Sequence, residues 1–371
     1  MECETLPLRL FWYIQNSERK AIMGEKIKFR KNENLLTIHP HWRGNPTADD
    51  KFFNRQHRWK PGMVNVFDMR FSRNPHRLAK RFVPWKPTMY VLRSLDDVQG
   101  NALVWLGHNS FFIQLGGKRI MIDPVYADIP FVKRRSDFPA NPSIFKGIDY
   151  LLISHDHFDH LDKPSVTKLV ADNPQMKLFC GLETGKLLQS WFPSLEVVEA
   201  GWYQQYEDDG LKLTLMPAQH WSKRSVNDGG ERLWGAFVIQ SDGISIYNSG
   251  DTAYASHFKE LPDFFPHIDY CMIGIGAYQP RWFMKPNHIS PYDALTASAE
   301  MCACVTIPMH YGTFDLSDEP LFNPPHAFAT EAKFRNINVI VPCLGEIVPL
   351  KPQVKKPEQL DNQISDATLS R

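Results

Sequence analysis

Residues 151–162 read LLISHDHFDHLD, an apolar run that changes abruptly into histidines and aspartates. The apolar run from Tyr150 to Ile153 is typical of a buried strand, and Ser154 ends it. Three imidazoles and two carboxylates then follow within positions 155–160. Core packing alone does not require such chemistry. By itself the stretch fits either a metal site or a histidine-rich solvated turn, and the rest of the chain decides between them.

The spacing inside this stretch favours metal ligation. Histidine and aspartate are ligands for hard to borderline divalent metals. His155 and His157 stand two positions apart, so on an extended loop both can reach one ion. Asp159 and His160 fall at the expected start of a helix, where they can turn toward a second ion.

The composition indicates a large globular protein. With 371 residues, 43% hydrophobic and 12% aromatic, the chain can bury a large core, as two or three domains or as one large α/β unit with extensions. Its six cysteines contain no C-x-x-C pair and are typical of thiols in a reducing compartment, so we predict a cytoplasmic location. No apolar run approaches the roughly 18 residues of a membrane helix, which predicts a soluble or peripheral protein.

Charge is distributed unevenly along the chain. The net charge of +1 argues against a dedicated nucleic-acid binder. Residues 1–100 nevertheless contain 19 Lys and Arg against 10 Asp and Glu, together with many aromatic residues. This basic segment can face phosphates, either of lipid headgroups or of a substrate, and we predict a peripheral membrane contact through it. The alternative is a solvated segment that wraps the main domain.

The first clear hairpin lies within residues 102–122, where Gly116 and Gly117 supply the positive φ angles of a tight turn. His108 and Asp123 both fall where strands end, the usual place for site residues in a layered α/β fold. We expect His108 to be a structural histidine. Asp123 is well placed to orient a metal-bound histidine. Further along, helices are expected over residues 163–171 and 291–302.

Four separate apolar strands end at a histidine or an aspartate: His155, His220, Asp251 and His310. Any one of these would be unremarkable, but together with their neighbours they suit two metal ions that share Asp251. One ion would bind three imidazoles and Asp251, and the other Asp159, His160, His310 and the shared carboxylate. Against a structural or mononuclear site, we predict a dinuclear centre. Its seven ligands would be His155, His157, Asp159, His160, His220, Asp251 and His310.

The run from His155 to His160 matches the H-x-H-x-D-H signature, and on it the chain resembles the metallo-β-lactamase superfamily. The downstream His220, Asp251 and His310 stand where the remaining ligands of that superfamily stand. The resemblance implies an α/β fold of four layers, the αββα sandwich, in which two mixed sheets pack face to face between outer helices. The metals would lie at the sheet edge.

The predicted division of the chain has three parts. Residues 1–100 would be an irregular extension that wraps the main domain, residues 101–345 the metallo-β-lactamase-like hydrolase domain, and residues 346–371 a polar C-terminal tail.

Further motifs narrow the resemblance to one branch, the N-acyl-phosphatidylethanolamine-hydrolysing phospholipase D family. They are WLGH at 105–108, PAQHWSKR at 217–224, GDT at 250–252, IGAYQPRWFMK at 275–285 and HYGTF at 310–314. The resemblance implies cleavage of a phosphodiester to N-acylethanolamine and phosphatidic acid with two Zn²⁺ ions per chain, Mn²⁺ or Fe²⁺ being alternatives. It implies a phospholipid or other phosphodiester substrate and no nucleic-acid partner, and a homodimer is one expected state.

The resemblance also implies roles for single residues. His288 matches the family histidine near the substrate phosphate, and Asp159 and His288 would be the catalytic residues, with a hydroxide held between the metals as nucleophile. Lys223, Arg224 and Arg281 are candidates for contact with an anionic headgroup. Asp123 and Asp156 would fix imidazole tautomers behind the ligands.

Two departures from the family pattern concern the substrate. Tyr292 and Asp293 stand where paired acidic residues are usual, and the leading 38 residues align with nothing in the family. They leave the acyl-chain pocket and the lipid undefined. The same ligand set serves lactonases and other small phosphodiesterases, which are the alternative function. A nuclease, a β-lactamase and a flavin-linked oxidoreductase fit less well, as does a non-enzymatic module. A non-enzymatic module would be expected to have lost ligands, and none is lost. The chain leaves no room for the additional domain that a nuclease or a flavin-linked oxidoreductase would need.

Overall fold

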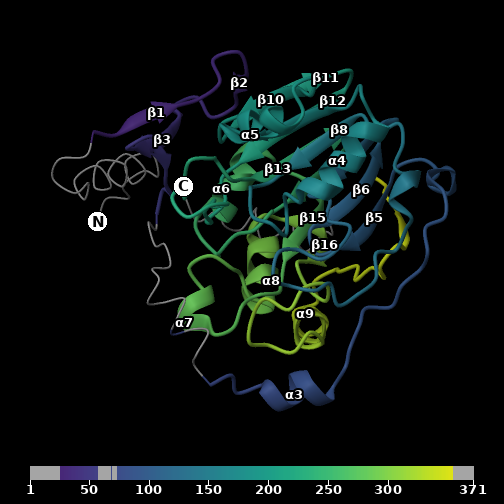
Figure 1. Ribbon diagram of the computed structural model, residues 1–371. Coiled ribbons are helices and arrows are strands. Elements are labelled where there is room, and N and C mark those ends of the chain that lie inside the picture. Colours follow the sequence, from purple (N-terminus) through teal and green to yellow (C-terminus); the bar gives the residue numbers. More distant parts are fainter. Residues whose placement is uncertain (1–25, 57–67, 69–72, 354–371) are drawn as a thin grey trace, which may run out of the picture.

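The computed structural model describes residues 26–56, 68 and 73–353, and two seven-stranded sheets occupy its middle (Figure 1). The first sheet has the strand order β10-β9-β8-β7-β6-β5-β17, and the second has the order β16-β15-β14-β13-β12-β11-β2. Both sheets are mixed: strands β7 to β10 are parallel in the first, and strands β14 to β16 are parallel in the second.

The strand bounds follow the apolar runs of the sequence. In the first sheet they are β5 Ala102–Gly107, β6 Ser110–Leu115, β7 Lys118–Ile122, β8 Tyr150–Ile153, β9 Lys177–Gly181, β10 Glu196–Ala200 and β17 Ile347–Pro349. In the second they are β2 Leu36–Thr37, β11 Gln204–Asp208, β12 Leu211–Met216, β13 Ala236–Ser241, β14 Ile244–Asn248, β15 Ile268–Gly274 and β16 Ala303–Met309.

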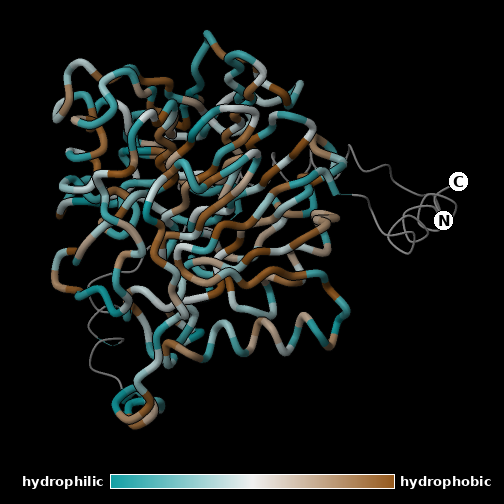
Figure 2. Tube along the Cα trace, turned by 90° about the vertical axis from the view of Figure 1, so that its right-hand side faces the viewer, coloured by the Kyte–Doolittle hydropathy of each residue, from teal (hydrophilic) through white to brown (hydrophobic). Residues whose placement is uncertain are grey.

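Strand β5 shows why these runs are continuously apolar. Its side chains alternate between two cores: Leu103 and Trp105 pack in the cluster that contains Phe237 of the second sheet, whereas Val104 and Leu106 pack in a separate cluster under the helices. A strand that is buried on both faces needs apolar residues at every position. In Figure 2 hydrophobic stretches of the chain, coloured brown, run through the middle of the molecule.

Helices cover the outer face of each sheet. Val166 of α4 and Leu188 of α5 pack on the first sheet, and Phe258 of α6, Leu295 of α8 and Phe328 of α9 pack on the second. The expected αββα sandwich is therefore confirmed. In the described part of the chain the helices are α3 Arg77–Phe82, α4 Lys163–Asp172, α5 Thr184–Trp191, α6 His257–Phe264, α7 Arg281–Met284, α8 Pro291–Glu300 and α9 Asn323–Phe334, with 3₁₀ turns at Leu95–Asp97 and Pro142–Ile144.

The chain before residue 100 contributes to the sheets. Strands β1 Lys28–Arg30, β3 Asn45–Ala48 and β4 Lys51–Phe52 form a small sheet of their own, and β2 adds an edge strand to the second large sheet. Asn45 accepts a hydrogen bond from the Trp202 amide, and Asn54 donates one to the His220 carbonyl, at 3.0 and 2.6 Å. This segment is thus tied to the loop that carries a predicted metal ligand.

The first residues of the predicted tail belong to the first sheet. Strand β17 pairs with β5 in antiparallel register, with Val348 opposite Leu103. A three-residue strand is too short to give a periodic signal, so the sequence pattern placed it outside the domain. Within the described parts of the chain, the helices all fall short of the length and apolar content that crossing a bilayer demands.

Helix α4, which follows the metal-binding stretch, begins at a side-chain cap. The Asp162 carboxylate accepts hydrogen bonds from the Ser165 amide and hydroxyl, at 3.0 and 2.5 Å. We expect Asp162→Ala to lower the free energy of unfolding by about 1 kcal/mol, because one amide of the first turn loses its acceptor. Asp162→Asn retains a capping oxygen and should lose much less. Urea denaturation measures both variants, and equal losses would contradict the capping role.

Candidate metal centre

The predicted ligands come from strand ends in both sheets. Strand β8 of the first sheet leads into the segment that carries His155 to His160, while β12, β14 and β16 of the second lead to His220, Asp251 and His310. Because these strands end at the same edge of the sandwich, residues more than 150 positions apart meet there.

Two four-membered clusters of ligand atoms form at this edge, and Asp251, His288 and His310 make a smaller third group. His155, His157, His220 and Asp251 each offer an atom within 4.8 Å of the others. Nε2 of His155 and Nε2 of His220 lie 2.9 and 3.3 Å from Nδ1 of His157, so three imidazoles converge. The second cluster contains His108, Asp159, His160 and His310, also within 4.8 Å.

Asp251 lies between the two clusters. Its Oδ2 atom is 3.2 Å from His310 Nε2 and 3.3 Å from His160 Nε2 in the second cluster. It is 3.7 Å from His220 Nε2 and 3.9 Å from His155 Nε2 in the first. A single oxygen thus faces imidazoles of both clusters, which is the position that a shared ligand would need.

The donor set fits a pair of divalent ions. Among the described residues, the buried Nε2 atoms of His160 and His310 have no hydrogen bond of acceptable geometry, although both face Asp251. Buried polar atoms are normally paired, so unpaired ring nitrogens aimed at a carboxylate are suitable ligand atoms for a cation. Imidazole and carboxylate ligands in groups of four suit zinc and similar metals.

Electrostatics keeps both carboxylates ionised. Burial opposes ionisation of Asp251, but the imidazoles of His160 and His310 outweigh it and hold the pKa of Asp251 well below its usual value. Burial likewise opposes ionisation of Asp159, and the neighbouring His160 and His108 lower its pKa. Burial lowers the pKa of His155 and of His220. The centre therefore offers ionised oxygens together with neutral imidazoles in its first cluster.

Asp123 contacts one of the predicted ligands, His160. Its carboxylate accepts hydrogen bonds from the Ser154 amide and hydroxyl, at 2.8 and 2.5 Å, and lies 2.8 Å from His160 Nδ1. Because a carboxylate only accepts, His160 Nδ1 donates and its Nε2 faces Asp251. Asp156 differs from the expectation: it pairs with the Arg232 guanidinium and accepts from the Lys223 amide, so its bonds hold the loop after His220 instead of an imidazole.

His288 stands beside the centre. Its Nδ1 atom is 3.9 Å from Asp251 Oδ2, and its ring centroid is 5.2 Å from that of His220. Arg281, expected to meet a headgroup, instead donates to Asp293 at 2.9 Å and to the His288 carbonyl at 3.3 Å. Lys223 is exposed, and its neighbour Arg224 donates to the carbonyls of Asp156 and Leu161.

His108 was expected to be a structural histidine, and no role was predicted for Asn109. In the structure, His108 Nε2 lies 2.9 Å from Asp159 Oδ2, and Asn109 Nδ2 lies 3.1 Å from Asp251 Oδ1. Both residues follow β5, which ends at the same edge as β8. Their position directly after an apolar strand is the sequence signal that could have indicated a role at the centre.

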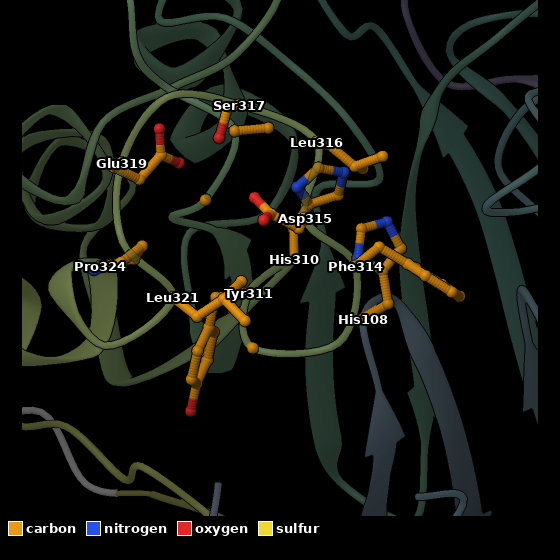
Figure 3. A pocket seen from close by; sticks show the side chains of 13 residues that line it. His108, His310, Tyr311, Phe314, Asp315, Leu316, Ser317, Glu319, Leu321 and Pro324 are labelled. Carbon is orange, nitrogen blue, oxygen red and sulfur yellow. The ribbon is translucent and has the colours of Figure 1, made fainter. Parts of the chain in front are cut away.

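A cavity of about 10 Å³, room for one water molecule, lies behind the second cluster. Figure 3 shows the rings of His108 and His310 side by side at one wall, with Ser317, Glu319 and Pro324 on the other side. The carboxylate of Glu319 accepts from the amides of Tyr278 and Gln279, at 3.1 and 3.0 Å. This cavity is too small for a lipid, and His108 and His310 form part of its wall.

Unusual backbone conformations gather around the centre. His108, Asp123 and His310 have φ angles of 52°, 40° and 60°, in the left-handed region that non-glycine residues seldom adopt. Gly276 packs directly behind His310: an added Cβ atom would lie 2.0 Å from the His310 carbonyl oxygen. The ligand loops are therefore held by tight backbone contacts.

Gly276→Ala should disturb the centre through this contact. Because the clash is with backbone, we expect a loss of about 1–3 kcal/mol in the free energy of unfolding. Gly229→Ala is the matched control, since an added Cβ there meets nothing closer than 3.8 Å. Chemical denaturation compares the two, and equal stability would disprove the close approach at His310.

A four-layer sandwich with clustered histidine and aspartate ligands at one sheet edge defines the class of metallo-β-lactamase-like proteins. Residues 118–311 match the family described as beta-lactamase superfamily domain, more than half of the chain, and the protein belongs to that family. The superfamily resemblance drawn from the sequence is confirmed.

Particular relatives extend this result. The chain is 29% identical over 286 residues to N-acyl-phosphatidylethanolamine-hydrolyzing phospholipase D 1 of Caenorhabditis elegans, covering 72% of this chain and 80% of the relative. It is 30% identical to a UPF0173 metal-dependent hydrolase of Sulfurisphaera tokodaii, covering 67% of this chain and 99% of the relative. Among solved structures, Igni18, a metallo hydrolase of Ignicoccus hospitalis, shares the fold with a TM-score of 0.54 at 20% identity, over 68% of this chain and 98% of that one.

Proposed function

We propose that this metal-dependent hydrolase cleaves the phosphodiester of an N-acyl-phosphatidylethanolamine-like phospholipid, releasing N-acylethanolamine and phosphatidic acid. The observation that carries the proposal is the placement of Asp251 Oδ2 within 3.9 Å of imidazoles from both clusters and of His288. The similarity to the Caenorhabditis elegans phospholipase D supports the choice of lipid.

In this proposal the chain holds two Zn²⁺ ions. His155, His157 and His220 would hold one, Asp159, His160 and His310 the other, and Asp251 would serve both. When bound, such ions acidify water toward neutral pH and neutralise negative charge on phosphoryl oxygens. Asp159, the catalytic carboxylate of the prediction, has a pKa held below its usual value and a side chain that is 15% exposed.

His288 would bind the substrate phosphate. Burial lowers the pKa of His288 to about 4, so at neutral pH the ring is uncharged and can donate one hydrogen bond to a phosphoryl or leaving oxygen. Arg281 fixes the segment that carries it through Asp293 and the His288 carbonyl. Arg281 therefore positions His288, and the exposed Lys223 remains the candidate for headgroup contact.

The proposal includes a peripheral contact with anionic lipid through the basic residues before position 100. Residues 1–25 lie outside the described part of the chain, while Lys28 and Arg30 of β1 pair with Asp50 and Glu183. A cytoplasmic location and a homodimer stay predictions.

The substrate is tested with vesicles of N-acyl-phosphatidylethanolamine, a cyclic phosphodiester and a lactone, each assayed on protein of measured metal content. We expect turnover of the phospholipid with release of N-acylethanolamine.

Asp251→Ala should lower this activity at least a hundredfold, because both ions lose a ligand. Asp137→Ala changes an aspartate whose side chain is 82% exposed and should match the wild type. If the lactone were the only compound turned over, the proposed phospholipid substrate would be wrong and the alternative function, a lactonase, would take its place.

A second prediction concerns His288. His288→Ala should lower kcat/KM for the phospholipid about a hundredfold while the bound metal stays unchanged, since the imidazole acts on the substrate and is no ligand of the predicted pair. Enzyme kinetics and metal analysis on the same preparation provide both readouts. Unaltered kinetics would return His288 to a structural role.

A further inference from the structure

We propose that the turn between β5 and β6 is a positioning device for both carboxylate ligands, in which His108 orients Asp159 and Asn109 orients Asp251. The inference rests on the proposed metal centre. It concerns residues that the predicted ligand set does not include. Two adjacent residues of one turn would thereby set the geometry of two ligands that come from different sheets.

The contact of His108 is with Asp159. The His108 side chain is buried, at 1% exposed, and its Nε2 lies 2.9 Å from Asp159 Oδ2. An ionised carboxylate only accepts hydrogen bonds, so the proton must be on His108 Nε2. Asp159 Oδ2 lies 3.7 Å from His160 Nε2 and 3.8 Å from His310 Nε2, so the bond from His108 fixes which way the carboxylate faces these imidazoles.

Asn109 acts on the other oxygen of Asp251. Its amide Nδ2, on a side chain also 1% exposed, lies 3.1 Å from Asp251 Oδ1. All of the close imidazole contacts of Asp251 are to Oδ2 instead, from His310 and His160 at 3.2 and 3.3 Å. By holding Oδ1, Asn109 presents Oδ2 to both clusters, which is the orientation that a shared ligand requires.

The turn is itself locked to the second sheet. The His108 amide donates to Thr313 Oγ1 at 2.8 Å, and the His108 carbonyl accepts from Trp105 Nε1 and from the His310 amide, at 2.9 and 3.1 Å. His108 adopts a φ of 52°, directly after Gly107 at 105°. A non-glycine residue held in this region by three hydrogen bonds indicates a conformation retained for its effect on the site.

The two residues should have different effects on metal binding. Among the predicted ligands, the His108 side chain contacts Asp159 and the ring of His310, which would serve the same ion. Asn109 Nδ2 contacts Asp251, which would serve both ions. Loss of a residue that orients a ligand typically weakens metal affinity about 10- to 100-fold. His108→Leu should therefore weaken one of two ions, and Asn109→Leu should weaken both.

The experiment uses the full chain, stripped of metal and re-equilibrated with Zn²⁺ in buffers of graded free concentration. Bound zinc per chain is measured by mass spectrometry of the metal, and the Tm of the metal-free protein by calorimetry. We expect two ions in the wild type, one unchanged and one weakened in His108→Leu, and both weakened in Asn109→Leu. His108→Gln retains an amide donor toward Asp159 and should recover most of the lost affinity.

Asn173→Leu is the matched control. Asn173 is 5% exposed and makes three hydrogen bonds to the backbone around Ile148, Phe145 and Leu169, none of them to a ligand. This variant should lower the Tm of the metal-free protein while both zinc affinities stay at the wild-type values. A purely structural role of the turn would make His108→Leu and Asn109→Leu behave in the same way as Asn173→Leu.

The outcomes separate this inference from the proposed function. The positioning role would be overturned if His108→Leu and Asn109→Leu bound zinc as tightly as the wild type. It would also be overturned if both variants lost affinity equally for both ions. A wild type that binds no pair of ions would overturn the metal centre as well. If the pair binds and the variants behave as expected, the inference stands even if the phospholipid is not turned over.

Discussion

A buried negative charge at Asp251 is the constraint on which the rest of the structure depends. An ionised carboxylate away from water is costly unless hydrogen bonds and opposite charges surround it. Asn109 holds one of its oxygens, and imidazoles from the segments after β8, β12 and β16 surround the other. These partners come from both sheets, so the carboxylate can be accommodated only where the two sheets end at a common edge.

The core between the sheets keeps that edge in register. Trp105 of the first sheet and Phe237 of the second are completely buried in the same cluster, and their strands precede or flank the ligand loops. Close packing resists small displacements, because a gap of a fraction of an ångström already loses contact energy. The loops add their own bonds, such as that from the His310 amide to the His108 carbonyl. The packed core and these bonds together hold the predicted ligands at one edge of the sandwich.

Much of the site could be predicted from the sequence because its signals are local. The stretch at 155–160 carries four predicted ligands within six positions, and His220, Asp251 and His310 each follow an apolar strand directly. The helix expected at 163–171 appears as α4, Lys163–Asp172, since a capping aspartate precedes a periodic apolar pattern. Supporting contacts were less predictable: Asp123 binds His160 as expected, whereas Asp156 binds Arg232.

By itself, the sequence determined the ends of the main strands, because apolar periodicity acts over a few neighbouring positions. Its H-x-H-x-D-H motif carried the resemblance that implied the fold class, and residue type predicted the ligand set. Only the tertiary structure decided which oxygen of Asp251 meets which imidazole and that Arg281 supports His288. It also placed His108 and Asn109 against the two carboxylates, and it brought the short strands β2 and β17 into the sheets. These features depend on contacts between residues that are distant along the chain, and such contacts exist only once the two sheets have packed together.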